Sequence, residues 1–129
     1  STIELGKGNI VKTGKDTAIF AFGNMLEIAL EASEKINATV VDMRFVKPLD
    51  KALIIEIANN SKLLISIEDN TVNGGAGSAI NELLQENNIT TPLKILGVPD
   101  KVTEHGSQSE LYELYGLTSE NIINVSKNK

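Results

Sequence analysis

Two hydrophobic patterns alternate along the chain, and this alternation constrains its fold more than any other feature. Thr17–Phe22 is a short apolar run bounded by Asp16 and Gly23, as expected of a strand buried on both faces. Apolar residues then recur at helical spacing, at Met25, Ile28, Ala29, Ala32 and Ile36. The same rhythm repeats, with strands predicted at residues 38–41, 62–67 and 93–97 and helices after Pro48 and Asp50 and over about 78–87.

Strand–helix–strand units in series predict an α/β fold, with a mostly parallel sheet and helices on both faces. Asn9–Lys12 precedes the first unit and is half-polar, which predicts an extra strand at an edge of the sheet. No internal linker or low-complexity tract is visible, so residues 1–129 are expected to form a single domain.

Residues that favour helix starts predict where four helices begin. Asn24 is expected to cap the first helix, Pro48 with Asp50 to open the second, Ser107 or Ser109 to cap a short helix through Tyr115, and Thr118 to cap a final one toward Val125. Asn, Asp, Ser and Thr carry a side-chain oxygen that can accept a hydrogen bond from the free N–H groups of a helix start, whereas Pro48 favours a helix start through its fixed backbone angle.

Charge and composition exclude several classes of function. The net charge is −5 and Lys and Arg form no basic run, so nucleic acid and anionic membranes are poor partners. The chain has no cysteine, which excludes disulfides, thiolate catalysis and cysteine-bound metals. No apolar stretch approaches the roughly 20 residues that span a bilayer.

Ligands of open α/β sheets usually bind beyond the carboxyl ends of the strands. Gly74, Gly75 and Gly77 lie between a predicted strand and a predicted helix, where main-chain N–H groups can hold a phosphate. Their spacing matches neither a dinucleotide fingerprint nor a P-loop, and Glu68 and Asp69 just upstream would repel a phosphate. A tight turn, packed closely against another backbone or subunit, is therefore favoured.

Glu68, Asp69 and Asn70 form the densest polar cluster at a strand end. Paired carboxylates can bind a divalent metal or perform acid–base chemistry. Three consecutive loop residues seldom point to one place, however, and no third ligand is evident. Hydrogen bonds to the loop backbone, or a subunit contact, are therefore favoured over a metal site.

His105 is the only histidine, so any imidazole chemistry depends on it. Its neighbours Glu104 and Ser107 do not form a recognised catalytic triad. A structural hydrogen-bonding role for His105 is therefore favoured over catalysis.

Arg44 and Lys47 mix positive charge with apolar neighbours at another strand end and can hold an anionic ligand. A salt bridge from Arg44 to Asp42 or Asp50, with Pro48 starting a helix, is the simpler interpretation.

Three segments of the chain resemble one enzyme family. They are residues 38–50, which read Ala-Thr-Val-Val-Asp-Met-Arg-Phe-Val-Lys-Pro-Leu-Asp, residues 67–70 followed by 74–82, and residues 96–100 followed by 104–106. In order and spacing they are similar to the C-terminal domain of 1-deoxy-D-xylulose-5-phosphate synthase, over about residues 5–117. The wider group includes transketolases and the pyruvate dehydrogenase beta subunit, but residues 43–50 favour the synthase. Asp69 replaces a common Glu, and Lys101 and Thr103 replace residues that are often apolar.

The resemblance implies a three-layer α/β/α sandwich with a five-stranded, mostly parallel sheet and one antiparallel edge strand. It also implies an enzyme that joins pyruvate to glyceraldehyde 3-phosphate with release of carbon dioxide, using thiamin diphosphate and Mg²⁺. In that family the cofactor lies between two upstream domains, and its Gly-Asp-Gly…Asn motif is absent here. No catalytic, cofactor-binding or metal-binding residue is therefore carried over to this chain.

By the same resemblance, this chain is expected to be an assembly domain of a three-domain, cytoplasmic homodimer and to be inactive alone. Its start at Ser1 without Met fits an excised piece. The candidate loop for contact with another domain or subunit comprises Glu68, Asp69, Asn70, Gly74, Gly75, Gly77 and His105. The alternatives are a domain or split subunit of another transketolase-family enzyme, or a freestanding regulatory module that binds a small ligand.

Overall fold

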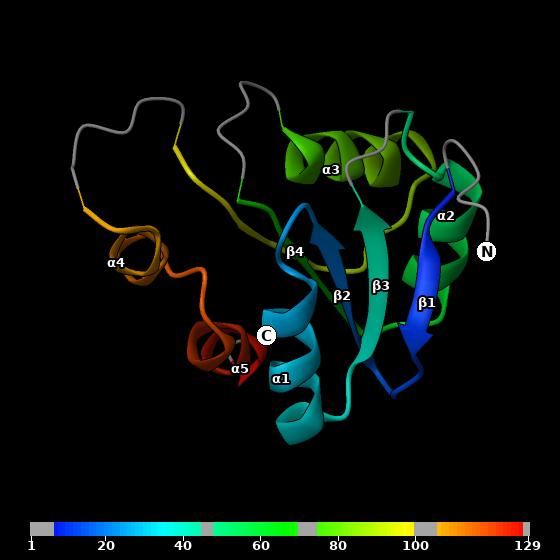
Figure 1. Cartoon of the computed structure of the whole chain (residues 1–129). Coiled ribbons are helices and arrows are strands. Elements are labelled where there is room, and N and C mark those ends of the chain that lie inside the picture. The colour runs from blue at the N-terminus through cyan, green and yellow to red at the C-terminus, as the bar shows by residue number, and fades with distance from the viewer. Residues whose placement is uncertain (1–6, 45–47, 70–74, 100–105, 128–129) are drawn as a thin grey trace.

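The computed structural model describes residues 7–44, 48–69, 75–99 and 106–127, and these contain one twisted sheet (Figure 1). Its strand order is β1-β3-β2-β4-β5. The strands are β1 (Asn9–Lys12), β2 (Thr17–Phe22), β3 (Thr39–Arg44), β4 (Leu63–Ile67) and β5 (Leu93–Leu96). β1 pairs with β3 in antiparallel orientation, and all the other described pairs are parallel. The predicted sheet, including its antiparallel edge strand, is confirmed.

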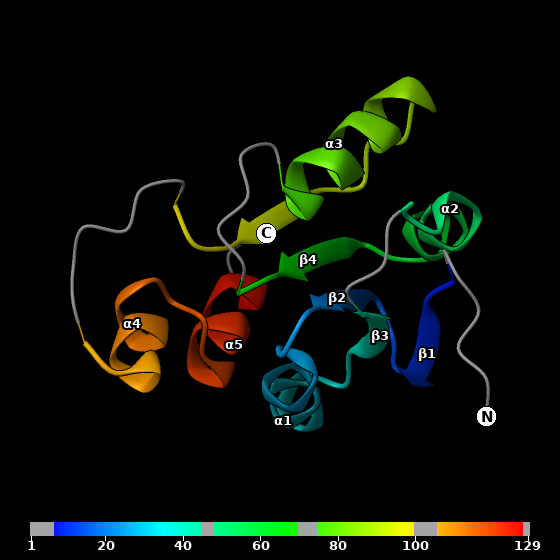
Figure 2. The same cartoon turned by 45° about the horizontal axis from the view of Figure 1, so that its top comes forward.

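Helices cover both faces of the sheet, as predicted (Figure 2). The helices are α1 (Leu26–Ile36), α2 (Lys51–Asn59), α3 (Ala76–Glu86), α4 (Gln108–Leu114) and α5 (Ser119–Lys127). The hydrophobic cluster on one face contains side chains of α2 and α3, and the cluster on the other contains side chains of α1 and α5. In the described part of the chain, no helix is both long and apolar enough to cross a membrane.

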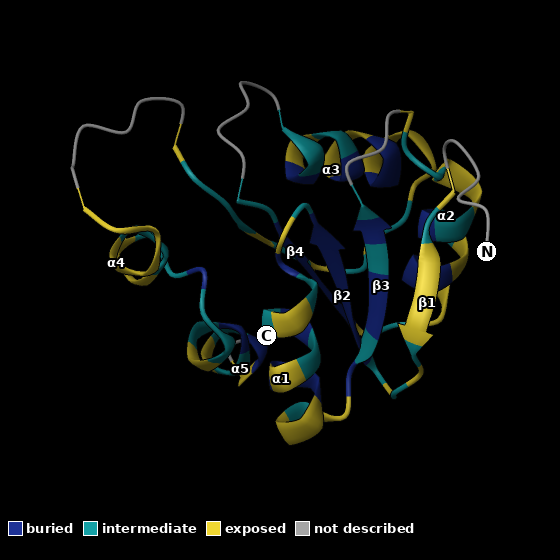
Figure 3. Ribbon diagram, in the orientation of Figure 1, coloured by how far each residue is buried: buried dark blue, intermediate teal, exposed yellow. Residues whose placement is uncertain are grey.

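The centre of the sheet supplies both hydrophobic cores (Figure 3). Every residue of β2 is buried, with Ala18, Phe20 and Phe22 facing α2 and α3. Ile19 and Ala21 alternate with them and face α1 and α5. Because successive side chains of a strand point to opposite faces, a central strand between two helical layers must be apolar throughout.

Two of the predicted helix starts differ from the observed ones. Helix α1 is capped at Met25, with no side-chain hydrogen bond, and Asn24 instead lies one residue outside the cap. Helix α3 begins at Ala76, two residues before the predicted start. In both cases a carboxylate from the end of β4 binds the loop or the helix start, and that contact is invisible in local sequence.

The other predicted caps are confirmed. Asp50 Oδ1 accepts a hydrogen bond from Leu53 N at 3.3 Å, so Asp50 rather than Pro48 caps α2. Ser107, not Ser109, caps α4 through a reciprocal capping box with Glu110. Thr118 Oγ1 accepts from Asn121 N at 3.1 Å at the start of α5.

Candidate functional site

β2 and β4 are parallel neighbours in the sheet, and the direction in which later strands are added to the sheet reverses between them. β2 leads through α1 to β3 on one side, whereas β4 leads through α3 to β5 on the other. The helices after these two strands therefore leave to opposite faces, which is the arrangement that opens a ligand crevice in many α/β proteins. The residues that follow the two strands, at this edge of the sheet, define the candidate site.

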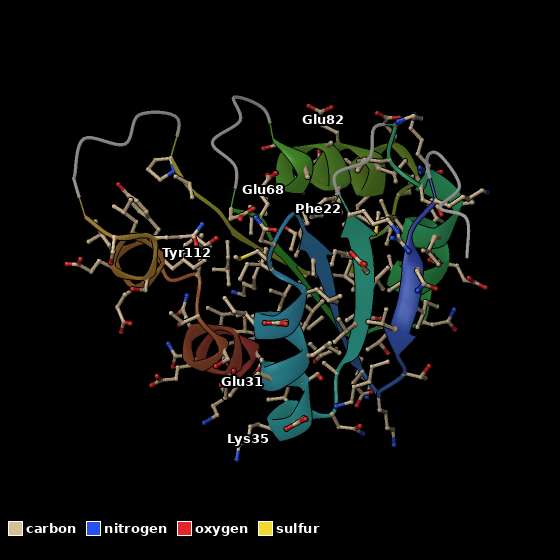
Figure 4. All side chains as sticks on the ribbon, in the orientation of Figure 1. Phe22, Glu31, Lys35, Glu68, Glu82 and Tyr112 are labelled. Atoms are coloured by element: carbon tan, nitrogen blue, oxygen red, sulfur yellow. The ribbon has the colours of Figure 1, made fainter. Side chains whose placement is uncertain are left out.

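Glu68 follows β4 and binds the start of α3 (Figure 4). Its Oε1 accepts a hydrogen bond from Ala76 N at 2.9 Å. The N-cap residue of this helix, Gly75, has no side chain to perform that task. The Glu68 carboxylate thus takes the place at the helix N-terminus that a phosphate would need. The predicted hydrogen bond from Glu68 to the loop backbone is thus found at the first N–H of the helix that follows the loop, and the alternative of a subunit contact stays a prediction.

Gly77 allows α3 to lie directly on β4 and β5. It is buried, and an ideal Cβ built on it would lie 2.5 Å from Ile95 Cγ2 and 2.8 Å from Ser66 Oγ. Such distances leave no room for a side chain without movement of its neighbours. The close packing expected for this glycine is therefore packing within the domain.

Asp69 joins three elements across the crevice. Its Oδ2 accepts a hydrogen bond from the Tyr112 hydroxyl of α4 at 2.9 Å and another from Asn24 Nδ2 at 3.2 Å. Its Oδ1 lies 3.5 Å from Asn24 N. These contacts bridge the end of β2, the end of β4 and α4, at the position where a ligand would otherwise enter.

The surroundings of Tyr112 stabilise its neutral hydroxyl. Burial first, then the hydrogen bond to Asp69 and the charge of that carboxylate, raise the pKa of Tyr112 from 10.0 to about 12. A folded pKa above the unfolded one means that the contact stabilises the fold below pH 10, and that this contribution is lost as the pH rises through 12.

The tyrosinate absorbance of the chain is expected to show a late-titrating step that belongs to Tyr112. Tyr112→Phe should remove this late step and flatten the fall of stability between about pH 10 and pH 12. Asp69→Asn should move the step toward lower pH, because the amide removes the negative charge beside the hydroxyl. An unchanged absorbance titration in Tyr112→Phe would contradict the assignment.

The other residues of the candidate contact loop are only partly tested by the structure. Asn70, Gly74 and His105 lie outside the described residues. The structure brings Glu68 and Gly75 together at the start of α3, whereas Asp69 points to the other face, toward α4. Among the described residues, no group of three His, Cys, Asp or Glu side chains could hold a metal ion.

Arg44 ends β3 in a conformation that its sequence did not predict. Its φ is 61°, in the left-handed region that costs a residue with a side chain about 1–2 kcal/mol. The two carboxylates expected to form its salt bridge accept main-chain N–H groups instead. Asp42 Oδ1 binds Arg44 N at 3.0 Å, and Asp50 binds Leu53 N and, at 3.0 Å, Gly8 N.

Sequence reasoning missed Tyr112 entirely and assigned Asn24 to a helix cap. The partner of both residues is Asp69, which lies 43 residues from Tyr112 and 45 from Asn24. Neither spacing belongs to a local motif, so only the packing of α4 against the ends of the strands could reveal the cluster. The single available signal was the density of carboxylates after β4.

Comparison with known proteins identifies close relatives of the chain. The family described as "Transketolase, C-terminal domain" matches residues 6–122. The 1-deoxy-D-xylulose-5-phosphate synthase of Dechloromonas aromatica is 48% identical over 122 residues, which are 95% of this chain and 20% of that protein. The synthase of Aeromonas hydrophila is 50% identical over 115 residues, 89% of this chain and 18% of that protein. The chain thus spans about a fifth of the length of these curated relatives.

Solved structures give the same match at the level of the fold. A split gene transketolase, described as an inactive beta4 tetramer, has a TM-score of 0.88 and 35% identity, over 98% of this chain and 43% of that one. The transketolase of Campylobacter jejuni has a TM-score of 0.65, over 96% of this chain and 19% of that one. Its identity is only 16%, so this second likeness concerns the fold alone.

Proposed function

Because this chain belongs to the family of transketolase C-terminal domains, we propose that it is the assembly domain of a 1-deoxy-D-xylulose-5-phosphate synthase. The observation that carries the proposal is the 48–50% identity to synthases over most of the chain. Identity to the split gene transketolase is lower, at 35%, which makes a split subunit of another transketolase the weaker alternative. The complete enzyme is proposed to join pyruvate to glyceraldehyde 3-phosphate as a cytoplasmic homodimer.

Thiamin diphosphate and Mg²⁺ supply the chemistry of carbon–carbon bond formation in such an enzyme, but the residues of this chain do not fit them. The Gly-Asp-Gly…Asn motif is absent from the sequence. The Glu68 carboxylate occupies the start of α3, where it would repel a diphosphate. We therefore place the cofactor, the metal and every catalytic residue in the domains that precede this one.

The arrangement at the ends of the strands supports an assembly role rather than ligand binding. Glu68 and Asp69 both use their carboxylates to hold parts of this domain together. A freestanding module would need those same groups for its ligand, so the hydrogen bonds count against it.

Expression of the complete reading frame that contains this chain tests the proposed function. The complete protein is expected to form 1-deoxy-D-xylulose 5-phosphate from pyruvate and glyceraldehyde 3-phosphate when thiamin diphosphate and Mg²⁺ are present. The isolated chain is expected to form none, and calorimetry should detect no binding of thiamin diphosphate to it. Stoichiometric binding to the isolated chain would overturn the assignment of the cofactor to the preceding domains.

Gly75→Val in the complete enzyme tests the contact loop. Gly75 has φ −60° and ψ −172°, a conformation open to any residue, so valine adds bulk without backbone strain. The dissociation constant of the dimer, measured by sedimentation, is expected to rise about tenfold, so the dimer is weakened by roughly 1.4 kcal/mol. The unfolding midpoint of the isolated chain should change little. Gln85→Val, at the exposed far end of α3, is the control and should leave sedimentation unchanged.

A further inference from the structure

We propose that helix α4 is a latched strap, which separates from the ends of β2 and β4 as a unit while the rest of the domain stays folded. The hydrogen bond between Tyr112 and Asp69 is the latch, and Gly116 marks the point about which the strap opens. Opening uncovers the Asp69 carboxylate in the crevice between β2 and β4. The inference goes beyond the proposed function and does not depend on it.

The first observation is the sparse packing of α4. None of its residues, Gln108–Leu114, is buried, whereas each of the other described helices has at least two buried residues. Leu114 is 56% exposed, although leucine is usually buried. Figure 3 shows α4 at the margin of the domain, apart from the helices that lie against the sheet. Segments with few buried apolar contacts open at low free energy, before the rest of a protein unfolds.

The second observation is the length of α4. It has seven residues, far fewer than the roughly 12–15 residues at which isolated helices become marginally stable in water. The capping box of Ser107 and Glu110 supports its first turn but adds no contact with the rest of the domain. The helix therefore depends on contacts with other elements, and it leaves as a unit once these contacts break.

The third observation is the contact that joins α4 to the ends of the strands. Tyr112 Oη donates a hydrogen bond to Asp69 Oδ2 at 2.9 Å (Figure 4). The Tyr112 ring also packs against the hydrophobic cluster on the α1 and α5 face of the sheet. Because a hydrogen bond weakens steeply once its geometry is lost, this latch is either closed or open.

The residues after α4 show where the strap ends. Leu117 is fully buried in the cluster with α1 and α5. Between α4 and Leu117, Gly116 has φ 72°, a backbone conformation that favours glycine, and its carbonyl oxygen accepts from Asn121 Nδ2 at 2.9 Å. Ser119 Oγ donates to Glu31 Oε1 at 3.0 Å and ties the start of α5 to α1. The chain is thus anchored from Gly116 onward and held more weakly over α4.

Opening of the strap changes the chemistry of the crevice. In the closed state the Asp69 carboxylate is shared between the Tyr112 hydroxyl and the Asn24 amide. When Tyr112 leaves, the carboxylate loses the hydroxyl that shields it, at the edge where open α/β sheets bind their ligands. The position of α4 therefore decides whether this carboxylate is shielded or free.

Hydrogen exchange of single amides in the 129-residue chain, followed by NMR, tests whether α4 opens separately. The amides of Leu111 and Tyr115, which are hydrogen-bonded in the closed state, are compared with amides in the middle of α3. After correction for intrinsic rates, the α4 amides are expected to exchange at least about a hundredfold faster, with a weaker dependence on urea.

Two outcomes of this experiment would overturn the proposal. Equal rates and equal urea dependence in α3 and α4 would show that α4 opens only when the whole domain unfolds. Exchange of the α4 amides at the rate of an unfolded peptide would show that no latch holds the helix in place.

Two substitutions separate the latch from the stability of the whole domain. Ile54→Val, in the core on the α2 and α3 face, should speed exchange in α3 about fivefold and leave exchange in α4 unchanged, because this core stays packed when the strap opens. Tyr112→Phe should speed exchange in α4 at least about tenfold, because it removes the latch but keeps the ring. Faster exchange of α4 in Ile54→Val, or unchanged exchange of α4 in Tyr112→Phe, would contradict the proposal.

Discussion

Gly77→Val is expected to destabilise the chain by about 3 kcal/mol, which is the upper part of the range for overpacked cores. The absent side chain of Gly77 is what lets α3 lie against β4 and β5. The first added carbon would lie 2.5 Å from Ile95 Cγ2, and valine adds two methyl groups beyond it. Urea unfolding of the chain, followed by circular dichroism, measures the loss.

Gly97→Val is the matched control for this prediction. An ideal Cβ on Gly97 would lie 3.8 Å from its nearest neighbour, Glu68 O, so the first carbon meets only ordinary contact. Gly77→Ala should cost less than Gly77→Val, because Ile95 is 50% exposed and can move, and because alanine favours a helix by about 1 kcal/mol over glycine. Similar losses for Gly77→Val and Gly97→Val would contradict the packing argument.

Asp69→Ala is expected to cost the chain about 2 kcal/mol, since hydrogen bonds to a charged group contribute about 1.5–3 kcal/mol. The substitution leaves the partly buried hydroxyl of Tyr112 without its acceptor and releases Asn24. The attachment of α4 to the ends of the strands should weaken most. Urea unfolding measures the total loss of unfolding free energy. Faster hydrogen exchange of the amides of α4 would show that this helix is the part that is destabilised.

A double-mutant cycle isolates the contact between Asp69 and Tyr112. The losses of Asp69→Ala and Tyr112→Phe are expected to be less than additive, with a coupling of about 1 kcal/mol, because both remove the same hydrogen bond. Asn24→Ala removes only the longer hydrogen bond to Asp69, at 3.2 Å. It should therefore destabilise the chain less than Asp69→Ala or Tyr112→Phe. Strictly additive losses would show that the side chains act independently.

The parts of the fold that follow from local sequence were predicted well. The alternation of apolar runs with helical spacing gave the order of the elements, because burial between two layers requires a strand to be apolar on both faces. The half-polar composition of Asn9–Lys12 indicated the edge strand, whose Ile10 and Val11 are indeed partly exposed. Asp50, Ser107 and Thr118 act as predicted because a capping bond spans only three residues.

The parts that failed depend on contacts between distant segments. Asn24 was assigned to a helix cap because its partner, Asp69, lies on another strand. The start of α3 was placed two residues late because Glu68 stabilises it from the end of β4. The expected salt bridge of Arg44 is replaced by a hydrogen bond to its main chain, which its left-handed backbone permits.

The sequence by itself determined the α/β architecture and, through its motifs, the transketolase-like family, because hydrophobic period and motif spacing are properties of neighbouring residues. Only the tertiary structure decided what the carboxylates after β4 do. Glu68 turns to one face and binds α3, whereas Asp69 turns to the other and binds Tyr112 and Asn24. The physical reason is that successive residues at the end of a strand point to opposite faces, so their roles depend on which helix packs there.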